Sequence, residues 1–147
     1  MSYIASTSYI NSDILKLLRG RYWVIFTNQN PDAKKLSEVE NASLYRQLVQ
    51  TYRDAKLPFE TVVGRYSGNY EDGIILFTLK EITRQDAADL AKQYGQESVL
   101  THEGLVYQDG SCNPVVEWVF PCSEPEDNYT LLRSTYFYAD INFNEKI

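Results

Sequence analysis

Two helices with clear start signals, set between apolar strand-like runs, constrain the fold of this chain most. Ser37 stands three residues before Glu40, which is the spacing of a helix-opening capping box, and Thr83 opens a second helix in the same way with Asp86. Around these helices the elements read strand, helix, strand, strand, helix, strand. This order predicts an α+β domain of the ferredoxin-like, split βαβ type (β-α-β-β-α-β), an architecture that hosts many unrelated functions.

Apolar runs and turn residues give the expected boundaries. The continuous run 22–27 is rich in β-formers and predicts a strand that is covered on both faces. The first helix is expected to run to about residue 56, with its apolar positions on one packed face: Val39, Leu44, Leu48, Tyr52 and Ala55. The other expected elements are strands at 59–63 and 73–79 joined by a polar loop at 66–72, a second helix from Thr83 to Gly95, and strand material over 98–108 with a turn in it.

The chain length of 147 residues fits one domain that can bury an adequate core. Residues 1–11 are expected to form a flexible arm, and residues 12–20 a short helix that ends at Gly20. Residues 22–110 form the predicted βαββαβ core. Residues 111–147 form an acidic, Tyr-rich C-terminal extension with two further strands, at 115–120 and 131–138, and the sequence leaves open whether these strands join the main sheet.

Charge is distributed unevenly along the chain. Residues 1–96 carry 12 basic and 11 acidic side chains, whereas residues 97–147 carry 2 and 9, and the net charge is −6. A surplus of this sign repels phosphate backbones, so direct nucleic-acid binding is not expected. With no long apolar span or leader pattern, and with Cys112 and Cys122 expected as free thiols, we predict a cytoplasmic protein that does not contact membranes. The oligomeric state is not predicted.

Motifs that carry known chemistry are not found in the sequence. His102 is the only histidine, and strand alternation would place its neighbours Thr101 and Glu103 on the opposite face, so no metal site is expected. There is no nucleophile elbow and no glycine-rich phosphate loop, and the carboxylate pairs 71–72 and 126–127 fall in predicted loops where they stay solvated. The sequence therefore predicts no catalytic residues and no cofactor.

Several short motifs between residue 23 and about residue 109 resemble a bacterial domain-of-unknown-function family, number 3293. Its members have a strand that ends in a Thr-X-X-Asn-Pro-like turn, a Glu-Asn pair early in the first helix, and a Gly-Gln pair that closes the second. The matching stretches here are 27–31, 40–41 and 95–96. The family usually carries Glu-X-Ser before its third strand, whereas this chain keeps the acid at Glu71 but has Gly73 in place of the serine. The resemblance supports the fold, and the family has no established activity to transfer.

The matched positions are mostly polar. In a split βαβ arrangement they can converge, which would gather a set of candidate ligand-binding residues: Thr27, Asn30, Asn41, Glu71 and Gln96. Amides and a carboxylate held together can hydrogen-bond a small polar ligand. Each residue also has a structural explanation, because Asn30 precedes a proline in a turn and Gln96 follows a helix-ending glycine.

The C-terminal extension suggests a different function. Tyrosines are common interface anchors, and acidic side chains complement a basic partner. The candidate partner-binding residues are Glu117, Glu124, Glu126, Asp127, Tyr129, Tyr136 and Tyr138. The sequence therefore predicts a non-catalytic interaction module that binds a protein partner, for example a phage or mobile-element inhibitor of a host nucleic-acid enzyme. Two alternatives stay open: a domain that binds a small polar ligand through the Asn/Gln/Glu cluster, and an enzyme that uses Glu71.

Overall fold

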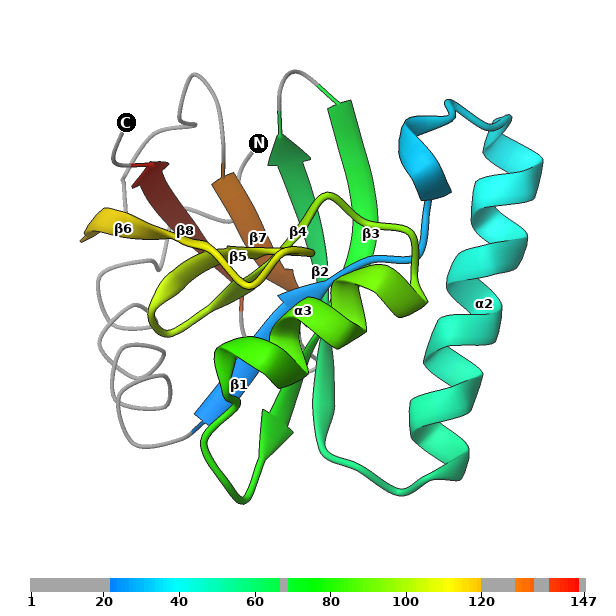
Figure 1. Ribbon diagram of the computed structural model, residues 1–147. Coiled ribbons are helices and arrows are strands. Elements are labelled where there is room, and N and C mark those ends of the chain that lie inside the picture. Colours follow the sequence, from blue (N-terminus) through cyan, green and yellow to red (C-terminus); the bar gives the residue numbers. More distant parts are fainter. Residues whose placement is uncertain (1–21, 67–68, 120–128, 134–137, 146–147) are drawn as a thin grey trace.

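The computed structural model describes residues 22–66, 69–119, 129–133 and 138–145, with side chains over 22–64 and 70–113 (Figure 1). Two α-helices and a short 3-10 helix accompany eight strands in this part of the chain. The helical elements are η2 (Pro31–Ala33), α2 (Glu38–Asp54) and α3 (Arg84–Gln93). The strands are β1 (Tyr22–Phe26), β2 (Phe59–Tyr66), β3 (Asn69–Thr78), β4 (Ser98–Thr101), β5 (Gly104–Tyr107), β6 (Cys112–Val119), β7 (Tyr129–Arg133) and β8 (Tyr138–Glu145).

All eight strands belong to one antiparallel sheet that closes on itself, in the order β1-β3-β2-β7-β8-β6-β5-β4. The α+β class is therefore confirmed. Strand β1 lies between β3 and β4, and β2 lies beyond β3, but four more strands continue the sheet until it meets β4. The overall strand order thus differs from that of an open ferredoxin-like sheet. The strands of the C-terminal extension do join the main sheet, and closure leaves no unpaired sheet edge.

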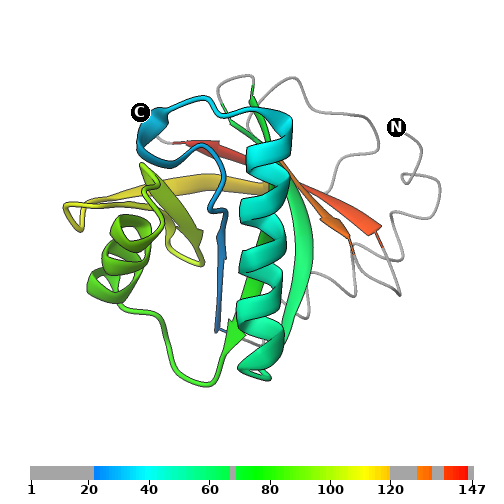
Figure 2. The same ribbon diagram turned by 90° about the vertical axis from the view of Figure 1, so that its right-hand side faces the viewer.

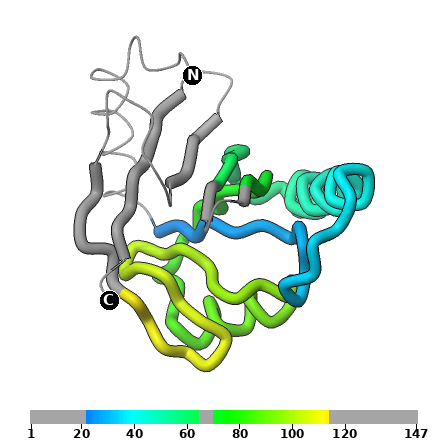
Figure 3. The backbone as a smooth tube through the Cα atoms, turned by 90° about the horizontal axis from the view of Figure 1, so that it is seen from above, coloured from blue at the N-terminus to red at the C-terminus, as the bar shows by residue number. Residues whose placement is uncertain are grey.

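The two helices pack on the outer face of the sheet, on either side of β1. Figure 2 shows both helices on the same side of the molecule, and in Figure 3 β1 (blue) runs between α2 (cyan) and the β4–β5 hairpin (yellow-green). Leu48 of α2 and Ala87 and Ala91 of α3 are buried against Val24 and Phe26 of β1. The alanines let α3 approach the strands closely, and the alternate residues of β1 face the enclosed side of the sheet.

Strand β1 has the expected character of a strand covered on both faces, since every residue from Trp23 to Phe26 is buried. Phe26 also anchors both helices, because its ring lies 5.7 Å from the Tyr52 ring of α2 and stacks at 5.4 Å on the Tyr94 ring after α3. The two tyrosine hydroxyls lie 3.2 Å apart. Burial, together with this hydrogen bond, raises the pKa of Tyr52.

The expected helix signals are present, but two of the positions expected on the packed face of α2 are exposed. Ser37 accepts a hydrogen bond from the Glu40 backbone while Glu40 accepts from the Ser37 backbone, so the capping box forms. Thr83 caps α3 by accepting from the Asp86 backbone. Val39, expected on the packed face, is 77% exposed. The five-residue step from Val39 to Leu44 rotates the side chain by about 140° relative to the packed face.

At the other end of α2 the same expectation fails again. Ala55 is exposed, since it lies beyond the last helical residue, and Val49 packs against the core instead.

The expected polar loop at 66–72 is mostly strand. Strands β2 and β3 stay paired as far as Tyr66 and Asn69, which places Glu71 opposite Gly64 and Asp72 opposite Val63 in a regular ladder. Glu71 and Asp72 are therefore strand residues and not the solvated loop pair that the sequence suggested. The sequence did not predict this strand because neither acidic residue favours a strand. Pairing with β2 decides the conformation here instead.

No helix among the described residues is long and apolar enough to cross a membrane.

Candidate functional site

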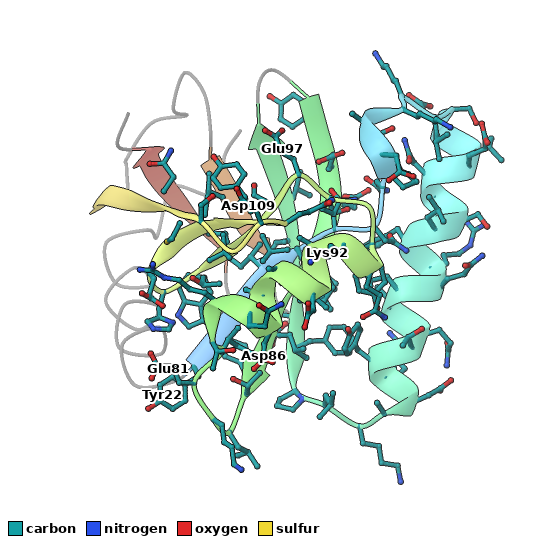
Figure 4. All side chains as sticks on the ribbon, in the orientation of Figure 1. Tyr22, Glu81, Asp86, Lys92, Glu97 and Asp109 are labelled. Atoms are coloured by element: carbon teal, nitrogen blue, oxygen red, sulfur yellow. The ribbon has the colours of Figure 1, made fainter. Side chains whose placement is uncertain are left out.

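A polar cluster lies where β1 ends and the chain turns towards α2, and it contains all five candidate ligand-binding residues. It consists of residues 27–30 together with Asn41 of α2, Glu71 and Asp72 of β3, and Gln96 after α3. The chain reaches it because β1 and β3 are paired neighbours, with Phe26 opposite Ile74. Figure 4 shows the side chains on the ribbon in the orientation of Figure 1.

Asn30 is the centre of the cluster. Its amide nitrogen donates to Glu71 Oε2 at 3.0 Å, and its Oδ1 accepts from the Leu36 backbone at 2.9 Å and from Asn41 Nδ2 at 2.8 Å. The Asn30 backbone nitrogen in turn donates to Asn41 Oδ1 at 2.9 Å. Asn30 is in the left-handed conformation, with φ of 47°, which asparagine tolerates better than most residues. The two asparagines therefore fasten the loop to the start of α2.

Thr27 and Gln29 connect this loop to β3 and to α2. Thr27 Oγ1 donates to the Asp72 carbonyl at 2.5 Å and accepts from the Gln29 backbone at 3.1 Å. Gln29 Oε1 accepts from the Asp72 backbone at 2.8 Å, and its amide nitrogen donates to the Asn41 carbonyl at 3.0 Å. Gln29, 5% exposed, is a member that the sequence reasoning missed, although it stands inside the Thr-X-X-Asn-Pro-like turn.

Gln96 joins the end of α3 to the same loop. Its side-chain amide nitrogen donates to the Gln29 and Tyr94 backbone carbonyls, both at 3.0 Å. Its backbone carbonyl accepts from the Gln108 side-chain amide at 2.7 Å. Gly95 beside it has φ of 63°, and its carbonyl accepts from the Asp32 backbone at 2.8 Å. The Gly-Gln pair thus ends the helix with a left-handed glycine and holds the β1–α2 loop from the opposite side.

The Glu71 carboxylate has few partners. It is half-buried, and the described residues give it one recorded hydrogen bond, from Asn30. Burial raises the pKa of Glu71, and the hydrogen bond from Asn30 opposes part of that shift because it favours the charged form.

Asn28 carries a second acceptor oxygen without a recorded partner. Its amide nitrogen donates to the Leu44 carbonyl at 2.6 Å, while its buried Oδ1 has no partner among the described residues.

Gly73, which stands where the resemblance noted above has a serine, lies tightly against the end of β1. A Cβ atom built on Gly73 would lie 2.4 Å from the Phe26 carbonyl oxygen, a distance at which the two backbones must move apart. The close approach of β3 to the end of β1 therefore requires glycine at this position in this chain.

His102 and Glu103 occupy a turn and not a strand. They join β4 to β5, so the strand alternation that we expected to separate His102 from its neighbours does not apply there. His102 Nε2 lies 3.1 Å from Glu81 Oε1. Cys112 on β6 is a free thiol, its Sγ lies 3.7 Å from the Glu103 carbonyl, and burial raises its pKa. Cys122 lies outside the described residues.

The candidate partner-binding residues are only partly described. Glu117, Tyr129 and Tyr138 stand on β6, β7 and β8, in the part of the structure described by its backbone. Glu124, Glu126, Asp127 and Tyr136 lie outside the described residues.

Comparison with known proteins gives one match, to a family model over residues 26–99 that is described as protein of unknown function (DUF3293). No curated protein matches the chain. No solved structure matches it either. The matched span runs from the end of β1 to β4 and therefore includes all five candidate ligand-binding residues. The chain belongs to the DUF3293 family.

Proposed function

We propose that this chain is a non-catalytic binding domain whose polar cluster takes a small ligand that carries hydrogen-bond donors. The observation that supports this most is the Glu71 carboxylate, which is half-buried and bonded to Asn30 through one oxygen. Removing a carboxylate from water is costly unless its lone pairs find donors. A ligand that donates to Glu71 would offset that cost.

The hydrogen-bond pattern indicates which kind of ligand fits. The amide nitrogens of Asn28, Gln29, Asn30, Asn41 and Gln96 each already donate to a protein oxygen. Glu71 Oε1 has no recorded partner among the described residues. A half-buried carboxylate attracts N–H donors and repels anions, so the matching ligand is an amine, a guanidine or an amide.

Backbone strain beside the cluster is consistent with a preformed site. Asn30, Asp32 and Ala33 all have positive φ values, between 47° and 58°. A left-handed residue that is not glycine costs about 1–2 kcal/mol, and such residues gather at sites where a loop must be held in one conformation. The bonds from the Asp32 backbone to Gly95 and from the Leu36 backbone to Asn30 hold this loop.

A thermal-shift screen with a panel of small amines, guanidines and amides tests the proposal. A binding probe should raise the midpoint of unfolding, and Glu71→Gln should abolish that rise because the variant removes the charge and one acceptor. Glu81→Gln is the matched control, since Glu81 stands in the β3–α3 connection and pairs with His102, outside the cluster. A probe that shifts the parent, Glu71→Gln and Glu81→Gln equally would exclude this site.

A protein-partner surface on the C-terminal strands is the second candidate, and the strand register favours it. Tyr129 pairs with Asn142, and Tyr138 pairs with Arg133, so positions 129 and 138 fall on the same face of the sheet. Position 129 also pairs with Arg65 on β2. Arg65 stands an even number of residues after Phe59, which pairs with the core residue Leu76, so positions 65 and 59 share one face of β2. Strands β7 and β8, which carry both positions, lie on the other side of the sheet from α2 in Figure 1.

This second candidate is tested by charge neutralisation. A variant with Glu124→Gln, Glu126→Gln and Asp127→Asn should capture a specific protein from a host lysate more weakly than the parent, and the loss should shrink at high salt. A partner that also binds or processes nucleic acid would agree with the inhibitor role predicted from the sequence. Equal capture of a validated partner by both baits would count against the acidic surface.

A further inference from the structure

We propose that Glu81, His102 and Glu103 form a binding site for a divalent zinc ion. One ligand atom from each residue lies within 4.8 Å of the other two. The three residues come from two segments, the β3–α3 connection and the β4–β5 turn, that the fold brings face to face. This site is separate from the polar cluster, and the proposal does not depend on the ligand proposed above.

The β4–β5 turn fixes the backbone positions of two of the three ligands. Thr101 Oγ1 donates to the Gly104 carbonyl at 3.1 Å and accepts from the Glu103 backbone at 3.2 Å, which closes the turn on both sides. Gly104 has φ of 133°, a conformation that side-chain-bearing residues rarely adopt. The Tyr22 ring meets the His102 ring edge-on at 6.3 Å and restricts its rotation. The imidazole is therefore oriented before any ion binds.

The spacing of the ligand atoms suits zinc after a small adjustment. Bonds of about 2.0–2.2 Å in a tetrahedral site place ligand atoms roughly 3.3–3.5 Å apart. His102 Nε2 and Glu81 Oε1 are already 3.1 Å apart. The Glu81 side chain is 58% exposed and that of Glu103 is 36% exposed, so rotation of these carboxylates can close the remaining distance without disturbing the core. Water would complete the coordination of a site with three protein ligands.

The chemistry of the donors selects the ion. One imidazole nitrogen and two carboxylates suit zinc and its first-row neighbours, whereas magnesium and calcium prefer oxygen ligands throughout. Glu81 and Glu103 together carry two negative charges against the one positive charge of Arg84, and this surplus attracts a divalent ion.

Arg84 is the competitor of the ion. Its Nη2 lies 3.1 Å from Glu103 Oε2, in an ion pair whose two side chains are 56% and 36% exposed. An exposed pair of this kind is weak enough for an ion to displace it from Glu103. The guanidinium charge still repels a cation beside it, so removing the arginine should strengthen zinc binding.

The single histidine makes the test direct. The untagged full-length protein is titrated with zinc chloride while the imidazole Cε1–H resonance is followed by NMR, and the dissociation constant is measured by competition with a chromogenic chelator. We expect the one imidazole signal to shift and to saturate at one equivalent of zinc. Glu81→Gln and Glu103→Gln should each weaken binding about tenfold or more, and Arg84→Gln should tighten it severalfold. Glu97→Gln is the matched control, because Glu97 is exposed and lies at the opposite end of the molecule from Glu81 (Figure 4).

Three results would overturn the site. The first is an imidazole signal that does not move with a tenfold excess of zinc. The second is an affinity that changes less than twofold in both Glu81→Gln and Glu103→Gln, since that shows a lone imidazole. The third is full affinity in His102→Gln that disappears in Cys112→Ser, because zinc is then held by thiolate. The amide NMR spectrum of each variant tests whether that variant is folded. Glu81→Gln leaves the β4–β5 turn intact, because Glu81 is exposed and stands outside that turn.

Discussion

Replacement of Asn30 by alanine should destabilise the fold by about 2–4 kcal/mol. The side chain makes three hydrogen bonds, to Glu71, to the Leu36 backbone and to Asn41. At roughly 1 kcal/mol net for each bond, their loss costs about 3 kcal/mol. Alanine in the left-handed conformation of Asn30 adds about 1 kcal/mol, while water that reaches the part-buried groups returns some of the loss. The sum is a large share of a typical stability of 5–15 kcal/mol.

Urea unfolding measures this loss, with Asn30→Asp and Gln93→Ala as companions. Asn30→Asp keeps the acceptor oxygen but sets a carboxylate about 3.0 Å from Glu71 Oε2, so the two carboxylates must share a proton. Its stability should therefore recover as the pH is lowered towards 5, whereas that of Asn30→Ala should not. Gln93→Ala, at the exposed end of α3, should change the free energy of unfolding by less than about 0.5 kcal/mol. A loss below about 1 kcal/mol in Asn30→Ala would refute the view that Asn30 holds the cluster together.

Three further predictions follow from individual residues. The folded-state pKa of Glu71 is raised, so the charged carboxylate destabilises the fold above that pKa. The stability of the parent relative to Glu71→Gln should therefore rise as the pH falls through the raised pKa and level off below about 4.5. Urea titrations at several pH values measure this profile. Restoring the serine of the family with Gly73→Ser should cost about 1–3 kcal/mol, because the added Cβ meets the Phe26 carbonyl, and thermal unfolding will show it as a lower midpoint. Thr83→Ala removes the α3 cap and should cost about 0.5–2 kcal/mol, with Thr83→Ser restoring most of it; no difference between the two variants would mean that the cap contributes nothing.

Local signals in the sequence predicted the local structure well. The capping box at Ser37, the cap at Thr83 and the left-handed Gly95 all form, because each depends on neighbouring residues whose chemistry is visible in the sequence. The buried strand β1 was predicted for the same reason, since its apolar run leaves no polar face.

Long-range pairing was harder to predict. Closure of the sheet depends on the pairing of β7 with β2, two strands far apart in sequence, and no local pattern shows that these strands will meet. The same limit explains Glu71, whose strand conformation comes from its pairing with Gly64 and not from its own propensity.

The convergence of the five polar motif residues was predicted, but their hydrogen bonds were not. The polar motif residues meet because they stand at the ends of β1 and α3 and at the start of α2, which a strand–helix order already implies. The sequence did not show which donors and acceptors of the cluster would stay unpaired, since this depends on which atoms face each other. Gln29 was missed because a polar residue in a predicted turn carries no sign that it will be buried.

The most direct test of the proposed function is the affinity of a binding amine, guanidine or amide for the parent and for Glu71→Gln, measured by isothermal titration calorimetry. The probe is the strongest binder from the thermal-shift panel. Our account predicts that Glu71→Gln weakens binding at least tenfold at neutral pH, and that the parent binds a cationic probe less tightly once acid protonates Glu71. Equal affinities in the two proteins, or a panel in which no amine, guanidine or amide binds, would contradict the proposal that Glu71 receives a donor ligand.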